Sequence, residues 1–177
     1  MTLDALAQRV GARLKEQGLL LATAESCTGG WVAQVVTSVS GSSEWFDRGF
    51  VTYSNDAKRE MIGVRVETLD RHGAVSEETA REMAAGALAA SRAQIAVAIT
   101  GVAGPTGGTP QKPVGMVCFA WAVRGGAVDS ETRHFAGDRK KVEYRLQGHL
   151  GGVGFGKGRF DAKGEITLPA GPPKREP

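Results

Sequence analysis

The chain has few of the residues that build disulfide, metal or nucleic-acid sites. Of its 177 residues only two are cysteine and three are histidine, and no Cys/His cluster has the spacing of a zinc site. Cys27 and Cys118 are too few for a disulfide framework, so the sequence favours a reduced protein without a metal. The net charge is only +3, and no block of Lys and Arg interleaves with aromatic residues. We therefore expect no nucleic-acid partner.

Long apolar segments are also missing. No run approaches the roughly 20 residues needed to span a bilayer. The first residues, Met1-Thr2-Leu3-Asp4, lack the basic and apolar regions of a signal peptide. We therefore expect no membrane association and a cytoplasmic location. The remaining composition, 41% hydrophobic and 23% charged, is typical of a globular domain with one core.

Alternating strand and helix patterns predict an α/β fold, a three-layer α/β/α sandwich with a mixed sheet. The segment 94–100 is apolar on both faces, which is typical of a central strand covered by helices on each side. Gly125-Gly126 predicts the turn of a closing antiparallel hairpin. The other expected strands are 19–23, 48–53, 114–123 and 127–135, and the expected helices are 3–14, 29–40, 54–61, 68–72 and 76–88.

The C-terminal part of the sequence changes character. Asp138 can cap a last helix through about Leu150, so we expect the folded domain to span residues 1–150. Residues 151–177 are rich in glycine and proline and hold too few apolar side chains to form a core. We predict that this tail is disordered.

The segment 25–30, Glu-Ser-Cys-Thr-Gly-Gly, concentrates polar chemistry between a predicted strand and a predicted helix. Open α/β sheets bind ligands at such carboxyl ends of strands, where the N–H groups of a helix start also point. Ser26, Cys27 and Thr28 are candidate nucleophiles, and the N–H groups at Gly29-Gly30 are candidate oxyanion donors. A structural alternative is that Ser26 or Thr28 simply caps the helix.

A base for such a nucleophile is most plausible at Lys58. The three histidines lie outside the candidate loops. Lys58 falls in the first turns of a helix that opens at Ser54, where the helix dipole and partial burial both lower the pKa of an amine. A neutral amine is what a serine–lysine hydrolase needs. Tyr53 could hydrogen-bond the nucleophile or the amine, and the structural alternative is a solvated surface lysine.

A second candidate loop, 100–105, follows the predicted central strand. Its sequence, Thr-Gly-Val-Ala-Gly-Pro, includes glycines that let the backbone approach a ligand closely. No Gly-Lys-Ser/Thr follows, so the loop is not a P-loop.

Several segments, in this order, resemble the C-terminal domain family of the CinA (competence/damage-inducible) proteins, above all its stand-alone nicotinamide-nucleotide amidases. The resemblance covers about residues 3–146. It is carried by Glu25-Ser26-Cys27-Thr28-Gly29-Gly30, Gly41-Ser42-Ser43-Glu44-Trp45-Phe46, Gly49-Phe50-Val51-Thr52-Tyr53-Ser54-Asn55-Asp56-Ala57-Lys58, His72-Gly73-Ala74-Val75-Ser76, Thr100-Gly101-Val102-Ala103-Gly104-Pro105, Gly107-Gly108 and Lys112-Pro113-Val114-Gly115.

The resemblance implies a reaction and roles for named residues. The reaction is hydrolysis of the carboxamide of nicotinamide mononucleotide to nicotinate mononucleotide and ammonia, in NAD salvage, without metal or cofactor. Ser26 would be the nucleophile, Lys58 its base, and Tyr53 an assisting group. Arg139, in a Gly-Asp-Arg motif, would bind the substrate phosphate, for which a bidentate guanidinium is suited, and Arg145 is a second candidate. The other implied substrate-binding residues are Glu25, Thr28, Gly29, Gly30, Thr100, Gly101 and Gly104.

Two departures from the family keep other functions open. The other half of the two-domain CinA proteins is absent, and after about Leu146 the apolar pattern of the family's last helix gives way to the glycine-rich tail. One alternative is a non-catalytic nucleotide-binding or competence-linked regulatory module. Another is an amidase acting on a different small carboxamide. The family resemblance also implies a homo-oligomer.

Overall fold

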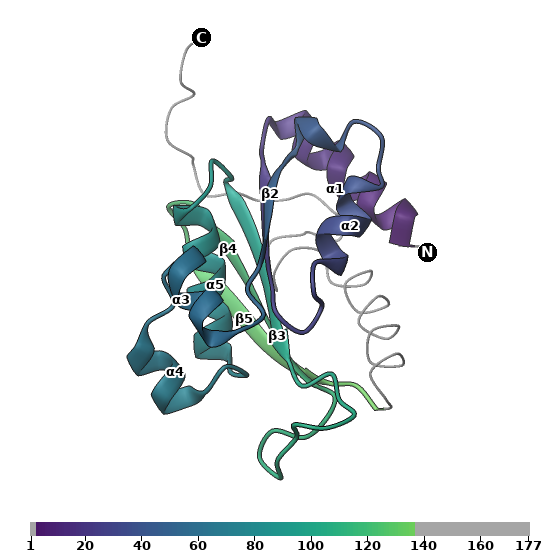
Figure 1. Ribbon diagram of the computed structural model, residues 1–177. Coiled ribbons are helices and arrows are strands. Elements are labelled where there is room, and N and C mark those ends of the chain that lie inside the picture. The colour runs from purple at the N-terminus through teal and green to yellow at the C-terminus, as the bar shows by residue number, and fades with distance from the viewer. Residues whose placement is uncertain (1–2, 137–177) are drawn as a thin grey trace.

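The computed structural model describes residues 3–136, which form one five-stranded sheet with helices on both faces (Figure 1). The strand order is β2-β1-β3-β4-β5. The elements, in chain order, are α1 (Leu3–Gln17), β1 (Leu21–Glu25), α2 (Trp31–Thr37), the 3₁₀ helix η1 (Ser42–Glu44), β2 (Phe46–Val51), α3 (Asn55–Ile62), α4 (Val66–His72), α5 (Glu77–Ala89), β3 (Ile95–Gly101), β4 (Met116–Val123) and β5 (Val128–His134).

The sheet is mixed, as predicted. β1 pairs in parallel with both β2 and β3, whereas β3–β4 and β4–β5 are antiparallel. From β1 the chain passes through α2 to β2 on one side, and then through α3, α4 and α5 to β3 on the other. Open α/β sheets bind ligands at such a reversal, outside the carboxyl ends of the strands. The fold therefore places the segment after Glu25 where a ligand site is expected.

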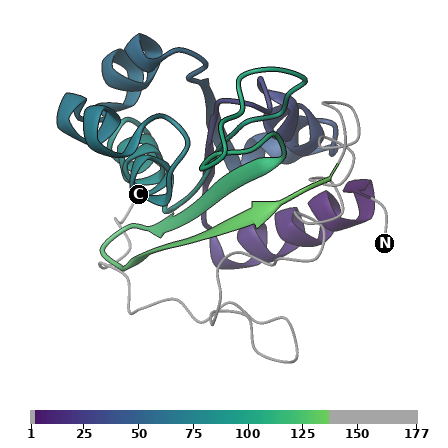
Figure 2. The same ribbon diagram turned by 90° about the horizontal axis from the view of Figure 1, so that it is seen from below.

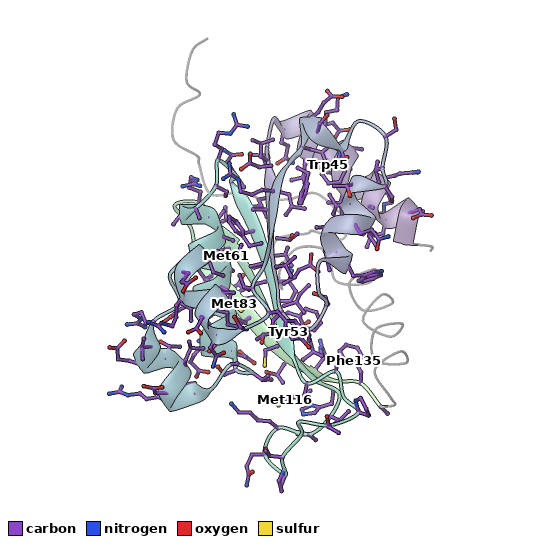
Figure 3. The ribbon with its side chains drawn as sticks, viewed as in Figure 1. Trp45, Tyr53, Met61, Met83, Met116 and Phe135 are labelled. Atoms are coloured by element: carbon purple, nitrogen blue, oxygen red, sulfur yellow. The ribbon has the colours of Figure 1, made fainter. Side chains whose placement is uncertain are left out.

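A hydrophobic core lies on each face of the sheet, and α1 and α5 lie on opposite sides of it (Figure 2). The core under α1 and α2 is built from large side chains such as Leu14, Trp45 and Phe119. Trp45 lies beside α1 (Figure 3). A Cβ on Gly11 of this helix would come within 2.5 Å of the Trp45 ring. Trp45 is buried in this core.

The opposite core, under α3, α4 and α5, is built largely from alanine. Small side chains let α5 approach the sheet closely, because alanines on the helix face alanines on the strands. The buried face of α5 repeats at helical spacing. It consists of Ala80, Met83, Ala84, Ala87 and Leu88, which pack with Ala22, Ala24, Ala96, Ala98, Ala120 and Ala122 of the sheet.

Two predicted boundaries near the candidate site need correction. β1 begins at Leu21 rather than residue 19, because the N–H of Leu20 donates to the side-chain oxygen of Gln94 instead of a strand partner. α2 covers only Trp31–Thr37 rather than 29–40. Gly29 and Gly30 have φ angles of 60° and 97°, so neither lies within the helix, and Gly30 is the N-cap of α2.

Some predictions fall outside the described residues. The helix expected from Asp138 to about Leu150 and the tail 151–177 lie beyond residue 136. Within residues 3–136, no helix is both long and apolar enough to cross a membrane.

Candidate active site

Ser26 is the first residue after β1 and is fixed to the neighbouring strand. Its N–H donates to the carbonyl oxygen of Ile99 in β3 at 2.9 Å, and its own carbonyl accepts from Gly29 at 3.1 Å. The side chain is mostly buried, with 8% of the residue exposed. Because the register pairs Glu25 with Ile99, Ser26 lies beside Thr100 at the carboxyl edge of the sheet.

Lys58 reaches this serine from α3. Its Nζ lies 3.1 Å from Ser26 Oγ, 2.9 Å from the carbonyl oxygen of Thr52 and 3.4 Å from that of Tyr53. Only 1% of Lys58 is exposed. As predicted, α3 starts at Ser54, whose Oγ accepts from the Ala57 N–H at 3.0 Å. This cap sets the helix position that brings Lys58 back toward Ser26.

The surroundings of Lys58 favour a neutral amine. Burial lowers its pKa from the ordinary 10.5, and the Cys27 thiol opposes this shift without cancelling it. Within residues 3–136 no carboxylate forms an ion pair with it. A neutral amine can donate its two N–H groups to the carbonyls of Thr52 and Tyr53, which leaves its lone pair for the Ser26 hydroxyl. The alternative of a solvated surface lysine is excluded.

Tyr53 contributes its main chain to this contact rather than its phenol. The residue is 62% exposed, and its described contact with Lys58 is through the carbonyl oxygen. The expected hydrogen bond from the phenol to the nucleophile or the amine is absent among residues 3–136. Thr52, which holds Lys58 through its carbonyl, was not predicted, since a main-chain acceptor leaves no signal in residue type.

The Glu25 carboxylate has an internal role. It is 1% exposed and accepts hydrogen bonds from the N–H groups of Gly30, Val32 and Ala33 at 3.1, 3.0 and 2.8 Å. Thr23 Oγ1 lies 3.4 Å from it. The carboxylate therefore ties the residue before Ser26 to the residues that start α2, and it fixes the turn from inside.

This arrangement changes the expected role of the glycines. The Gly30 N–H donates to Glu25 and the Gly29 N–H donates to the Ser26 carbonyl, so neither N–H is available to an oxyanion in this conformation. Their positive φ angles instead form the turn that brings the N–H groups of α2 back over Glu25.

Thr28 differs from its neighbours in the turn. It is 8% exposed, and its Oγ1 is closed to solvent and has no hydrogen-bond partner among residues 3–136. The helix-capping alternative for Thr28 is thus not supported: the α2 N–H groups have Glu25 as their acceptor. A buried hydroxyl without a partner costs about 1–3 kcal/mol of stability.

The second candidate loop lies next to this turn but is held by its own contacts. Thr100 is fully buried, and its Oγ1 donates to the Ala74 carbonyl at 2.7 Å. A Cβ on Gly101 would lie 2.8 Å from the Met116 carbonyl oxygen, and Gly104 has a φ of 81°. Both glycines therefore serve the path of the loop. Arg139 and Arg145 lie outside the described residues, and no metal-binding group of three or more His, Cys, Asp or Glu side chains occurs within residues 3–136.

The Glu25→Gln variant tests the internal role of the carboxylate. The amide keeps one acceptor oxygen but turns an NH₂ group toward main-chain donors, so we expect the free energy of unfolding to fall by about 2–4 kcal/mol. Urea unfolding measures this change. The matched control is Glu44→Gln, which removes an exposed ion pair with Lys15 and should change stability by less than about 1 kcal/mol. Equal losses in the two variants would contradict the role.

Comparisons with known proteins agree with the sequence motifs. A nicotinamide-nucleotide amidohydrolase PncC of Escherichia coli K12 is 58% identical over 137 residues, 77% of this chain and 83% of that protein. The PncC of Enterobacter agglomerans is 51% identical over 145 residues, 82% of this chain and 87% of that protein. A competence/damage-inducible protein from Agrobacterium tumefaciens superposes with a TM-score of 0.81 at 47% identity, covering 85% of this chain and 92% of that one.

The domain family agrees with these relatives. Residues 3–149 match the CinA C-terminal domain, a stretch that includes the Ser26 turn, Lys58 and the loop after β3. With the same fold in the solved structure, this match shows that the chain belongs to the CinA C-terminal domain family.

Proposed function

We propose that this chain is a nicotinamide-nucleotide amidase. It hydrolyses the carboxamide of nicotinamide mononucleotide to nicotinate mononucleotide and ammonia, a reaction of NAD salvage. The observation that carries the proposal is the buried contact of 3.1 Å between Lys58 Nζ and Ser26 Oγ. The names of relatives at 51–58% identity, nicotinamide-nucleotide amidohydrolase, support the substrate.

In the proposed mechanism Ser26 is the nucleophile and Lys58 is the base. The neutral amine takes the proton from Ser26 Oγ as the oxygen attacks the carboxamide carbon. The ammonium form of Lys58 then gives this proton to the leaving nitrogen, the C–N bond of the tetrahedral intermediate breaks to release ammonia, and an ester of Ser26 remains. In the second half, Lys58 takes a proton from water, the water oxygen attacks the ester carbon, and the proton returns to Ser26.

The main-chain acceptors around Lys58 support this proton transfer. The carbonyls of Thr52 and Tyr53 hold the amine whether it is neutral or charged, so its partners need not rearrange during the reaction. Burial lowers the pKa of Lys58 and thereby raises the fraction that can act as a base near neutral pH.

In the proposed function Arg139 binds the phosphate of the substrate. Turnover should therefore depend on whether the substrate carries this phosphate. We expect ammonia release from nicotinamide mononucleotide with a kcat/KM about 10²-fold or more above that for nicotinamide riboside, which lacks the phosphate. A coupled ammonia assay measures the rates, and chromatography identifies nicotinate mononucleotide as the product. Ser26→Ala protein prepared in parallel controls for contaminating amidases.

The outcomes separate three functions. Phosphate-dependent ammonia release supports the amidase. Equal or faster release from a substrate without phosphate indicates an amidase for another carboxamide. Calorimetric binding of the nucleotide without any ammonia release indicates a non-catalytic module. Self-association remains a prediction, which light scattering measures directly.

A further inference from the structure

The unpartnered Thr28 hydroxyl lies two residues after Ser26, in the same turn. It is the buried side-chain polar atom that finds no hydrogen-bond partner among residues 3–136. The main-chain N–H of Thr28 also forms no hydrogen bond within these residues. Both donors of this residue thus stay unused two residues after the proposed nucleophile, although a buried hydroxyl is normally paired.

The donors around Thr28 already have partners. The N–H groups of Gly30, Val32 and Ala33 donate to Glu25, and those of Ser26, Gly29 and Trp31 donate to main-chain carbonyls. Hydrolysis of an amide places negative charge on the carbonyl oxygen in the tetrahedral intermediate, and this oxygen needs donors that are not otherwise engaged. Of the residues in the turn, Thr28 is suited to supply one.

On the basis of the proposed function, we propose that the Thr28 hydroxyl donates a hydrogen bond to the substrate's carboxamide oxygen as it becomes negatively charged. The Thr28 oxygen is closed to solvent in the ligand-free structure, and the residue's remaining exposure lies on its other atoms. A change of the χ1 rotamer moves Oγ1 to the place of the methyl group or of the hydrogen on Cβ. The proposed hydrogen bond requires this rotation to bring the hydroxyl to the substrate, and it requires no movement of the main chain that Glu25 fixes.

The direction of the hydrogen bond follows from the proton balance. The leaving nitrogen receives its proton from Lys58, whose Nζ contacts Ser26 Oγ, so the reaction needs no second acid there. The carboxamide oxygen is a pure acceptor, and a hydroxyl is a donor that carries no charge. Thr28 therefore stabilises the intermediate without competing for the proton that Lys58 transfers.

The Thr28→Val variant tests this role, because valine has the shape of threonine without the hydroxyl. We expect kcat for nicotinamide mononucleotide to fall about 10²-fold or more and KM to change by less than about threefold, since the bond strengthens as charge develops. Thr28→Ser, which keeps a hydroxyl, should retain kcat within about fivefold. The unfolding midpoint of Thr28→Val should not fall, because no hydrogen bond is lost.

Thr68→Val is the matched control. Thr68 is also buried, but its hydroxyl donates to Glu82 at 2.6 Å, and it lies on α4. This variant should lower the unfolding midpoint and leave kcat within about twofold. For Thr28→Val we expect the opposite result, in which turnover is lost and stability is kept. Removing a hydroxyl with only a structural role would not produce this result.

Each result decides between the two hypotheses. If the wild-type chain releases ammonia and Thr28→Val does so at the same kcat, the inference is overturned and the proposed function stands. A Thr28→Val protein that loses turnover together with a lower unfolding midpoint also overturns it, in favour of a structural role. If the wild-type chain releases no ammonia, the proposed function fails and the role of Thr28 fails with it.

Discussion

Replacing Ser26 with alanine is expected to lower kcat for ammonia release by about 10⁴-fold or more. The variant lacks the oxygen that would attack the carboxamide, and Lys58 is left without the proton it would take. The fold should survive, because the N–H and carbonyl of residue 26 keep their main-chain hydrogen bonds. Steady-state ammonia release, checked by circular dichroism of the same sample, measures the effect.

Cys27→Ala is the control for this substitution. Cys27 is a buried neighbour of Ser26 and the other strong nucleophile in the turn. Its removal should keep kcat within about threefold. The assignment fails if Ser26→Ala keeps more than about a tenth of the wild-type kcat, or if Cys27→Ala is the variant that loses turnover.

Replacing Lys58 with methionine is expected to lower kcat by about 10²–10⁴-fold, which is the usual contribution of a positioned base. The same substitution should remove a pH dependence of stability. Because burial lowers the pKa of Lys58 in the folded chain, the unfolded chain binds more protons between this lowered pKa and 10.5. The wild-type free energy of unfolding therefore gains a contribution that rises with pH in this window, and Lys58→Met lacks it.

Urea unfolding at a series of pH values up to about 10.5 compares the two slopes. Relative to the wild type, Lys58→Met should become more stable as the pH falls, by up to about 1.4 kcal/mol per pH unit within the window. The control is Lys15→Met, which removes an exposed lysine paired with Glu44 and should keep the wild-type slope. Parallel curves for the wild type and Lys58→Met would show that the pKa of Lys58 is not lowered.

Much of the architecture could be predicted because its signals are local. Ser54 and Ser76 are strong helix caps, and both accept an N–H three residues on, as the sequence predicts. The alanine face of α5 and the two-faced apolar strand β3 follow from the periodicity of their residues. The mixed sheet follows from the order of these elements together with the hairpin turn.

The site was predicted in part. The place of Lys58 in the first turns of α3 could be predicted, whereas its burial could not, and its contact with Ser26 is the one that the family resemblance implies. The role of Glu25 was missed because a capping carboxylate usually lies next to or within the first turn of its helix. Here it lies in the preceding strand, and a left-handed glycine turn brings the helix back to it.

The contacts made by main-chain groups could not be predicted. Thr52 and Tyr53 hold Lys58 through carbonyl oxygens, and any residue type at these positions has such an oxygen. The missing partner of Thr28 is likewise a property of three-dimensional packing, since the sequence alone leaves Thr28 as a candidate nucleophile, a substrate-binding residue or a helix cap. These features depend on how β1, β2 and α3 meet, which local patterns do not specify.

The position of β1 between β2 and β3 has a consequence for synthesis on the ribosome. Ser26 and Lys58 both emerge early, but the Ile99 carbonyl that holds Ser26 belongs to a strand made much later. At about 5–20 residues per second, the ribosome takes about 4–15 seconds to pass from β1 to β3. A nascent chain released after Lys58 and before β3 would contain both proposed catalytic residues and still lack the strand that holds Ser26.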